Sequence, residues 1–337
     1  MKPKTADSAM QPTTLPHPQD ADYEDLLSLW ADLESGLAMV LGNPLIIPDF
    51  ERKLRQYDRW MQDLLRQDTD TGLYLLFQLA TNASVGYSAL HALVSAVICH
   101  LTAAELQLPR EERDSLVLAA MTMNIAMTRL QDELAAQAEK PNPQQQASIQ
   151  AHAFSGRLML IDVGVEDSLW VNVVAAHHDV LPLAEGELMQ WAPVDRLAHI
   201  LRTVDRYAAM ISPRKTRAGR TATESVRSIM AAANGPSGTR DPVGFALVRA
   251  TGLCPPGTYV RMDNGDVAVV LRRSATPNHP LVATVLNRAG DTLSPPRLHR
   301  TATSSPLIQA ALTQDAIKIR INHQSLLRQG IQADKTA

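Results

Sequence analysis

Aromatic residues, cysteines and long apolar runs are scarce in this sequence of 337 residues. Aromatic side chains make up only 4% of it, so an aliphatic core is expected. The two cysteines, Cys99 and Cys254, match no zinc or redox spacing, and a reducing cytoplasm is the expected compartment. No apolar run approaches the ~18 residues of a membrane span. The net charge of −3 gives no reason to expect nucleic acid or an anionic membrane as a partner.

Apolar periodicity and turn residues divide the chain into five segments. Residues 1–20 are polar and rich in proline, which predicts a disordered tail without a signal peptide. Helical spacing predicts N-terminal helices over 21–65 and a larger helical domain over 66–252. Residues 253–325 are expected to form a small β-rich module, and 326–337 a C-terminal tail. The predicted fold class is therefore mainly α, with a small β-rich module near the C-terminus.

Two local patterns make sharper predictions. Residues 110–134 read as one helix that begins after Pro109 and carries the stretch AAMTMNIAM on a buried segment. In the β-rich module, Asn264-Gly265 and Arg288-Ala289-Gly290 lie between runs rich in β-branched residues. Such turn residues predict two hairpins.

Five potential metal ligands lie on four predicted helices of the domain over 66–252. All have apolar neighbours and are expected to face inward: His91, His152, His177, His178 and Asp205. Binuclear hydrolases collect such side chains from several helices, because two metals neutralise a phosphate and activate a water molecule. Buried histidines can also be hydrogen-bonded core residues without a ligand. Spacing alone does not choose between these interpretations.

At this point the order of motifs over roughly 65–290 resembles the HD-GYP family, bacterial phosphodiesterases of the HD superfamily that act on cyclic di-GMP. The family's histidine motifs match YSALHAL with His91, HAFSGRLML with His152, and His177-His178-Asp179. Its later Ala-Asp-x-Tyr-Asp-Ala helix resembles the segment with Asp205. Further matches, in order, are Lys140-Pro141, Arg214-Lys215-Thr216-Arg217, Asp241-Pro242 and the β extension PPGTYVRMDNGDVAVV. The resemblance implies an HD-superfamily helical bundle.

Several family residues are missing from this sequence. Met123-Asn124 stands in place of the HD dipeptide, Met127 in place of a phosphate-contacting lysine, and DVLPLAEGELMQWAP in place of the GYP loop. Tyr87 occupies a position where some members have a glutamate. A methionine sulfur suits iron or manganese poorly, and asparagine supplies no bridging carboxylate. A binuclear iron or manganese centre is therefore not expected.

The remaining family positions imply a reduced site. His152, His177 and His178 resemble the ligands of the family's second metal, and three histidines could hold one divalent transition metal, as in some zinc sites. His91 and Asp205 resemble the remaining ligands of the first metal. Arg214 and Arg217 match phosphate-contacting arginines, which bind phosphate without a metal. A solvated loop after a helix would have the same arginine pattern.

Three functions stay open. The favoured hypothesis is a degenerate, catalytically inactive HD-GYP-like protein that acts in cyclic-dinucleotide signalling by binding a phosphate-containing ligand or a signalling protein. The alternative is an active metal-dependent phosphohydrolase with a mononuclear histidine site, in which Asp205 is a base or a further ligand. The third is a docking or oligomerisation platform comparable to the HDOD relatives. Each implies a cytoplasmic, bacterial protein.

Overall fold

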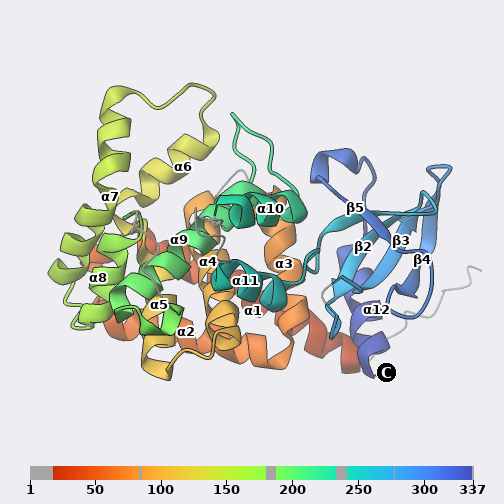
Figure 1. The fold of residues 1–337 in the computed structure, drawn as a ribbon, viewed down its shortest axis with the longest axis horizontal. Coiled ribbons are helices and arrows are strands. Elements are labelled where there is room, and N and C mark those ends of the chain that lie inside the picture. The colour runs from red at the N-terminus through yellow and green to blue at the C-terminus, as the bar shows by residue number, and fades with distance from the viewer. Residues whose placement is uncertain (1–17, 83–85, 180–186, 233–240, 277, 336–337) are drawn as a thin grey trace, which may run out of the picture.

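The computed structural model describes residues 18–82, 86–179, 187–232, 241–276 and 278–335. They form a helical body and a small five-stranded sheet at one end of it (Figure 1). This confirms the predicted mainly α fold with a small β module. Of the tail expected over 1–20, residues 1–17 lie outside the described residues, and the first helix begins at Pro18.

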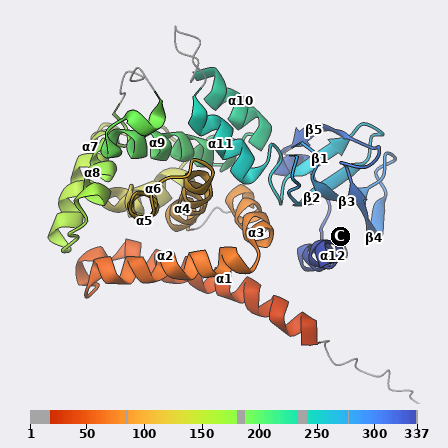
Figure 2. The same ribbon diagram turned by 60° about the horizontal axis from the view of Figure 1, so that its bottom comes forward.

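Eleven of the described α-helices precede the sheet. They are α1 (Pro18–Gly42), α2 (Phe50–Gln67), α3 (Thr69–Asn82), α4 (Tyr87–Glu105), α5 (Arg110–Thr122), α6 (Thr128–Ala136), α7 (Pro143–Asp162), α8 (Ser168–Ala176), α9 (Pro193–Ile211), α10 (Ala222–Ala232) and α11 (Pro242–Thr251). Short 3₁₀ turns lie between some of them: η1 (Pro44–Ile46), η2 (Ile125–Met127) and η3 (Leu188–Gln190). Figure 2 shows α1 and α2 packed along one side of the body.

Helix α4 forms the centre of the body. It packs against α1, α3, α5, α9 and α11, and its residues from Tyr87 to Cys99 are all buried. Within the described residues it is the one helix whose length and composition would suit a membrane span. Most of it is buried in the body, however, as in the core helix of a soluble protein. Because α4 carries His91, this burial places the first candidate ligand inside the helical core.

The prediction of a single helix over 110–134 is wrong. Helix α5 ends at Thr122, and η2 and α6 follow as separate elements. The Thr122 hydroxyl donates to the Leu118 carbonyl at 2.8 Å and accepts a 2.7 Å hydrogen bond from the Trp170 indole. Asn124 then takes a non-helical backbone conformation, as asparagine does readily. The stretch AAMTMNIAM therefore bends around the end of α5.

The β module is an antiparallel sheet in the order β4-β3-β2-β1-β5. Its strands are β1 (Tyr259–Met262), β2 (Val267–Arg272), β3 (Leu281–Leu286), β4 (Thr292–Arg300) and β5 (Ile308–Leu312). The two predicted hairpins are present, with Gly265 and Gly290 at φ values of 88° and 90°. After a short 3₁₀ turn, η4 (Gln314–Ala316), helix α12 (His323–Lys335) packs on β2. It covers most of the segment for which a C-terminal tail was expected, because Leu326 and Leu327 join the core of the module.

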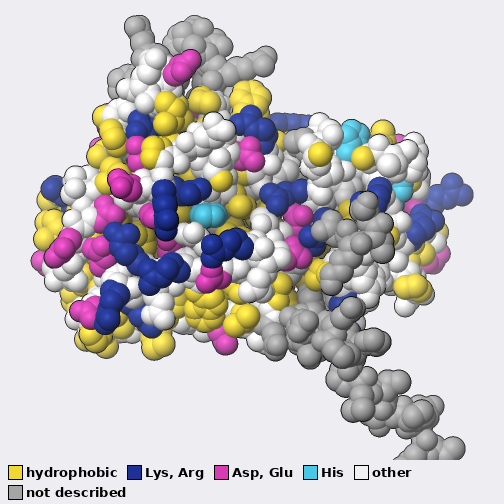
Figure 3. All heavy atoms as spheres, turned by 90° about the horizontal axis from the view of Figure 1, so that it is seen from below, with side chains coloured by type: hydrophobic (Ala, Val, Ile, Leu, Met, Phe, Trp, Pro, Cys, Tyr) yellow, Lys and Arg dark blue, Asp and Glu magenta, His cyan; other side chains and the backbone are white. Residues whose placement is uncertain are grey.

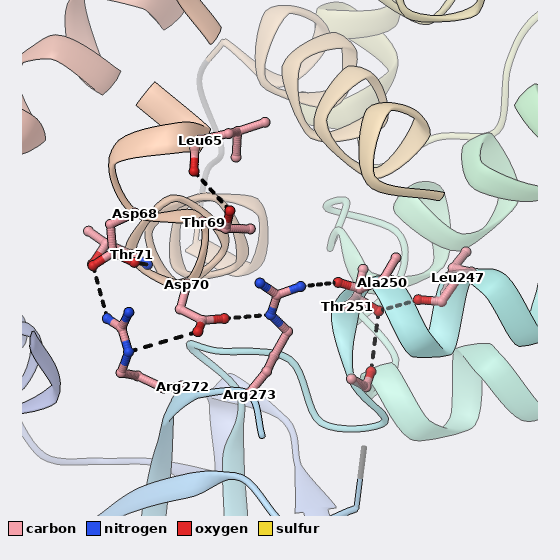
Figure 4. A network of polar contacts seen from close by, with 11 residues as sticks. Leu65, Asp68, Thr69, Asp70, Thr71, Leu247, Ala250, Thr251, Arg272 and Arg273 are labelled. Atoms are coloured by element: carbon pink, nitrogen blue, oxygen red, sulfur yellow. Dashed lines mark hydrogen bonds and ion pairs between the residues drawn. The ribbon is translucent and has the colours of Figure 1, made fainter. Parts of the chain in front are cut away.

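Two consecutive arginines at the end of the β2 strand region join the module to the body (Figure 4). Arg272 lies 2.9 Å from Asp68, and Arg273 lies 2.5 Å from Asp70 at the start of α3. Arg273 also donates to the Ala250 carbonyl at the end of α11. These mostly buried ion pairs hold the module against two helices of the body.

Charges of both signs are mixed on the face of the molecule that is seen from below (Figure 3). Helix α2 contributes pairs such as Arg55 with Glu51 at 2.8 Å and Arg55 with Asp167 at 3.0 Å. Neighbouring charges of opposite sign limit the field that such a surface projects.

Candidate metal centre

Helices α7 and α8 bring three histidines together. His152 lies in the middle of α7, whereas His177 is the residue that ends α8 and His178 follows it. The two helices pack closely at Gly156, where a Cβ atom would lie 3.3 Å from Cγ1 of Val174. A small residue at this position therefore sets how near the histidine of α7 comes to the pair after α8.

The three imidazole rings converge through their Nε2 atoms. Nε2 of His152 lies 3.3 Å from Nε2 of His177 and 3.2 Å from Nε2 of His178. Among the described residues, this is the one cluster of three or more potential ligands with all ligand atoms within 4.8 Å of one another. Two nitrogen ligands of a tetrahedral zinc ion, with bonds of about 2.0–2.1 Å, lie about 3.3 Å apart. The spacing around His152 therefore fits one transition-metal ion.

Backbone carbonyls determine which nitrogen carries the hydrogen in two of these rings. Nδ1 of His152 lies 2.5 Å from the Ile149 carbonyl oxygen, and Nδ1 of His177 lies 2.6 Å from that of Val174. A carbonyl oxygen only accepts, so each Nδ1 donates and each Nε2 presents a lone pair. These two lone pairs repel each other, and His178 can donate a hydrogen to only one of them. A metal ion would bind both, which makes this the arrangement expected of metal ligands.

Burial favours the uncharged form of two of the rings. It lowers the pKa of His177 to about 3, and the nearby His178 acts in the same direction. Burial is also the main cause that lowers the pKa of His152. The neutral imidazole is the form that binds metals. The prediction that His178 faces inward is wrong, because this residue is exposed, and the cluster therefore opens to solvent on its side.

His91 and Asp205 form a separate pair between α4 and α9. Nε2 of His91 lies 2.9 Å from Oδ1 of Asp205. Burial by itself would raise the pKa of Asp205, but the hydrogen bond and the electrostatic interaction with His91, together with the neighbouring imidazoles of His177 and His178, lower it to about 2. Asp205 is therefore ionised and close to the histidine cluster. The other ring nitrogen of His91, Nδ1, is buried without a hydrogen-bond partner among the described residues.

Tyr87 links this pair to the first of the two predicted phosphate-binding arginines. Its ring stacks on that of His91, with centroids 5.8 Å apart and an interplanar angle of 8°. The Arg214 guanidinium lies 5.1 Å from the Tyr87 ring centroid and donates to its hydroxyl at 3.1 and 3.2 Å. Sequence reasoning noted Tyr87 as a departure from the family and missed this contact.

The loop after α9 gathers three arginines. Arg214 and Arg217 face each other in a β-bridge, with backbone hydrogen bonds of 2.8 and 2.9 Å, and Arg217 also donates to the Ala209 carbonyl. Burial, Arg214 and Arg220 all lower the pKa of Arg217. None of the three forms an ion pair with a carboxylate within the part of the chain that the structure describes. Sequence reasoning missed Arg220, although it continues the same basic run.

Met123 and Asn124, which are predicted to stand in place of metal ligands, take part in packing and in a turn. Met123 is 1% exposed and belongs to the helical core. Asn124 begins η2, and its carbonyl accepts a 2.8 Å hydrogen bond from the Met127 backbone. The nearby Asp132 carboxylate is held by the Ser88 backbone N–H at 2.7 Å and by its hydroxyl at 3.0 Å. Within the described residues, no second cluster of three or more potential ligands accompanies the three histidines.

Comparison with known proteins gives one relevant similarity. The chain is 27% identical over 207 residues to Cyclic di-GMP phosphodiesterase PA4108 of Pseudomonas aeruginosa. The aligned region covers 59% of this chain and 48% of that protein. The chain thus spans about half the length of this curated relative. No family profile and no solved structure matches this chain. The chain is therefore a distant homologue of a cyclic di-GMP phosphodiesterase, which supports the predicted relation to this class of protein.

Proposed function

We propose that this chain is an HD-GYP-like signalling protein that binds a cyclic dinucleotide at a site with one metal ion. His152, His177 and His178 would hold a divalent transition metal, which, when bound, would polarise and neutralise a phosphate oxygen. The convergence of their Nε2 atoms, with separations of 3.2 and 3.3 Å around His152, is the observation on which this proposal rests. Nitrogen ligands favour zinc, nickel or copper over manganese.

The arginines after α9 supply the second part of the proposed site. Arg214, Arg217 and Arg220 lie close together without carboxylate partners among the described residues, so a bound phosphate would relieve their mutual repulsion. Tyr87 holds Arg214 next to His91, which in turn contacts Asp205. Phosphate recognition by guanidinium groups does not need a second metal.

Slow or absent hydrolysis is part of the proposal. Asn124 offers no carboxylate to bridge two metals, and Asp205 already accepts a hydrogen bond from His91. A general base works best when its pKa lies near the working pH, whereas the pKa of Asp205 is lowered to about 2. Asp205 is therefore better suited to orient His91, or to bind a metal, than to remove a proton.

A metal-reconstitution experiment tests the proposal. The full chain is stripped with a chelator, reloaded separately with Zn²⁺, Ni²⁺ or Mn²⁺, and analysed for metal content, cyclic di-GMP binding by calorimetry, and hydrolysis by chromatography. One ion per chain, nucleotide binding and no substantial turnover are expected. His177→Asn should lose the metal, whereas His299→Asn in the β module serves as a matched control and should keep it. Two ions per chain, or turnover at an ordinary enzymatic rate, would contradict the proposal.

The ionised Asp205 beside the histidines favours a second candidate, a single-metal phosphohydrolase. It predicts turnover with one ion per chain and loss of that turnover in Asp205→Asn. If neither metal nor nucleotide binds, the docking-platform hypothesis takes the place of both.

A further inference from the structure

Helix α7 has two apolar faces. Its inner face packs against α8 and η2 and includes His152 and Gly156. On the opposite side, three large apolar side chains face solvent: Phe154 is 59%, Leu158 46% and Ile161 49% exposed. Large exposed apolar patches on soluble proteins usually mark an interaction site.

The spacing of this outer face is that of a coiled-coil seam. Ala147, Ala151, Phe154, Leu158 and Ile161 follow one another at alternating intervals of four and three residues. These are the intervals between a and d positions of a heptad repeat, with Ala151 and Leu158 at a. In Figures 1 and 2, α7 lies at the end of the molecule opposite the β module, where the described elements leave its outer side uncovered. A second helix could pack along this seam.

The charges beside the seam indicate what kind of helix fits. Arg157 and Asp162 occupy the g and e positions that flank the apolar residues. Nε of Arg157 is buried without a hydrogen-bond partner, and neither residue forms an ion pair among the described residues. In a parallel coiled coil, a g residue of one helix meets the e residue five positions later on the other. Two parallel copies of α7 would therefore pair Arg157 with Asp162 twice, whereas antiparallel copies would bring like charges together.

We propose that α7 is the dimer interface of this protein, with the α7 helices of two copies packed parallel about a two-fold axis. The same surface patch serves both copies, as a two-fold interface requires. The proposal is independent of the ligand, although the same helix carries His152 on its inner face.

Light scattering on the full chain tests the association. The wild-type protein is expected to have twice the chain mass of 36.8 kDa. Leu158→Glu should be monomeric, because it places two carboxylates at the seam. Leu307→Glu is a matched control, since Leu307 is 42% exposed but lies in the β module. It should remain dimeric, and circular dichroism should show that both variants are folded. A wild-type protein that is monomeric at its highest soluble concentration overturns the proposal and points to a helix of a different protein as the occupant.

Two further experiments test the parallel orientation. Ala151→Cys and Leu158→Cys, made separately, should each form an interchain disulfide, because a parallel two-fold brings both positions to the axis. An antiparallel packing allows at most one of them to do so and would overturn the assignment. Arg157→Asp should weaken dimerisation by about tenfold, and adding Asp162→Arg in the same chain should restore it. Failure of this charge swap to restore the dimer also argues against the parallel pairing.

Discussion

Acid should destabilise the metal-free protein through His177. This ring is 1% exposed, and burial lowers its pKa to about 3 from the ordinary value of 6.5. Between these two pH values the unfolded chain binds a proton at this position and the folded chain does not. The unfolded state is therefore favoured as the pH falls below the unfolded pKa, and the loss is complete only below the folded pKa.

The size of the effect follows from the width of that interval. Each pH unit below 6.5 is worth about 1.4 kcal/mol, so at about pH 4.5 His177 alone should lower the free energy of unfolding by roughly 2.7 kcal/mol. This is a large part of the 5–15 kcal/mol that typically stabilises a folded protein. His100 acts in the same direction, because burial and the charges of Arg113 and Arg66 lower its pKa to about 4.

Urea unfolding of chelator-treated protein at neutral pH and at about pH 4.5 measures this difference. His177→Asn is the informative variant, because the asparagine amide can still donate to the Val174 carbonyl but does not titrate. His100 is present in both proteins, so its contribution cancels. The variant should lose less stability on acidification than the wild type, by roughly 2–3 kcal/mol. If both proteins lose the same amount, His177 is not held in its neutral form by burial.

Three further substitutions test other parts of the structure. In the wild type, the largely buried Glu112 carboxylate accepts a 2.7 Å hydrogen bond from Nε of Arg196. Arg196→Gln should lower the free energy of unfolding by about 3–5 kcal/mol in a urea titration, because it leaves this carboxylate without its charged partner. An effect below about 1 kcal/mol would mean that Glu112 takes up a proton or is rehydrated. Arg214→Ala should weaken cyclic di-GMP binding by about tenfold or more in calorimetry, and an unchanged affinity would remove the arginine cluster from the proposed site. Gly257→Ala should lower the melting temperature measured by calorimetry, because Gly257 has a φ of 89° and a Cβ there would lie 2.7 Å from the Tyr74 carbonyl oxygen. An unchanged melting temperature would show that this contact relaxes easily.

Helices that bury one regular face could be predicted from the sequence. Apolar spacing predicts helices over 21–65, and α1 (Pro18–Gly42) and α2 (Phe50–Gln67) cover most of that range. The end of α5 could not be predicted in this way. It coincides with a contact to Trp170, which donates to the Thr122 hydroxyl and lies 48 residues further along the chain. Periodicity reports which face of a helix is buried and contains no information about such a distant partner.

The candidate site likewise has features that the sequence could predict and features that depend on distant contacts. The histidines could be selected from their residue type and apolar neighbours. The contact of Arg214 with Tyr87 could not, because it depends on how the loop after α9 folds back onto the start of α4. The exposure of His178 was also missed, since a short apolar helix does not reveal where its last turn opens to solvent.

The tautomer of the two buried histidines is a local property, whereas their convergence is not. In both cases Nδ1 donates to the carbonyl three residues earlier in the chain, Ile149 for His152 and Val174 for His177. Each contact lies within one helix or at its end, so each Nε2 lone pair is presented without help from the other helix. The 3.3 Å between the two Nε2 atoms depends on the separation of α7 and α8, which Gly156 keeps small. A bulky side chain at Gly156 would therefore leave both histidines in the metal-binding tautomer and push α7 away from α8, which increases the distance between the two Nε2 atoms.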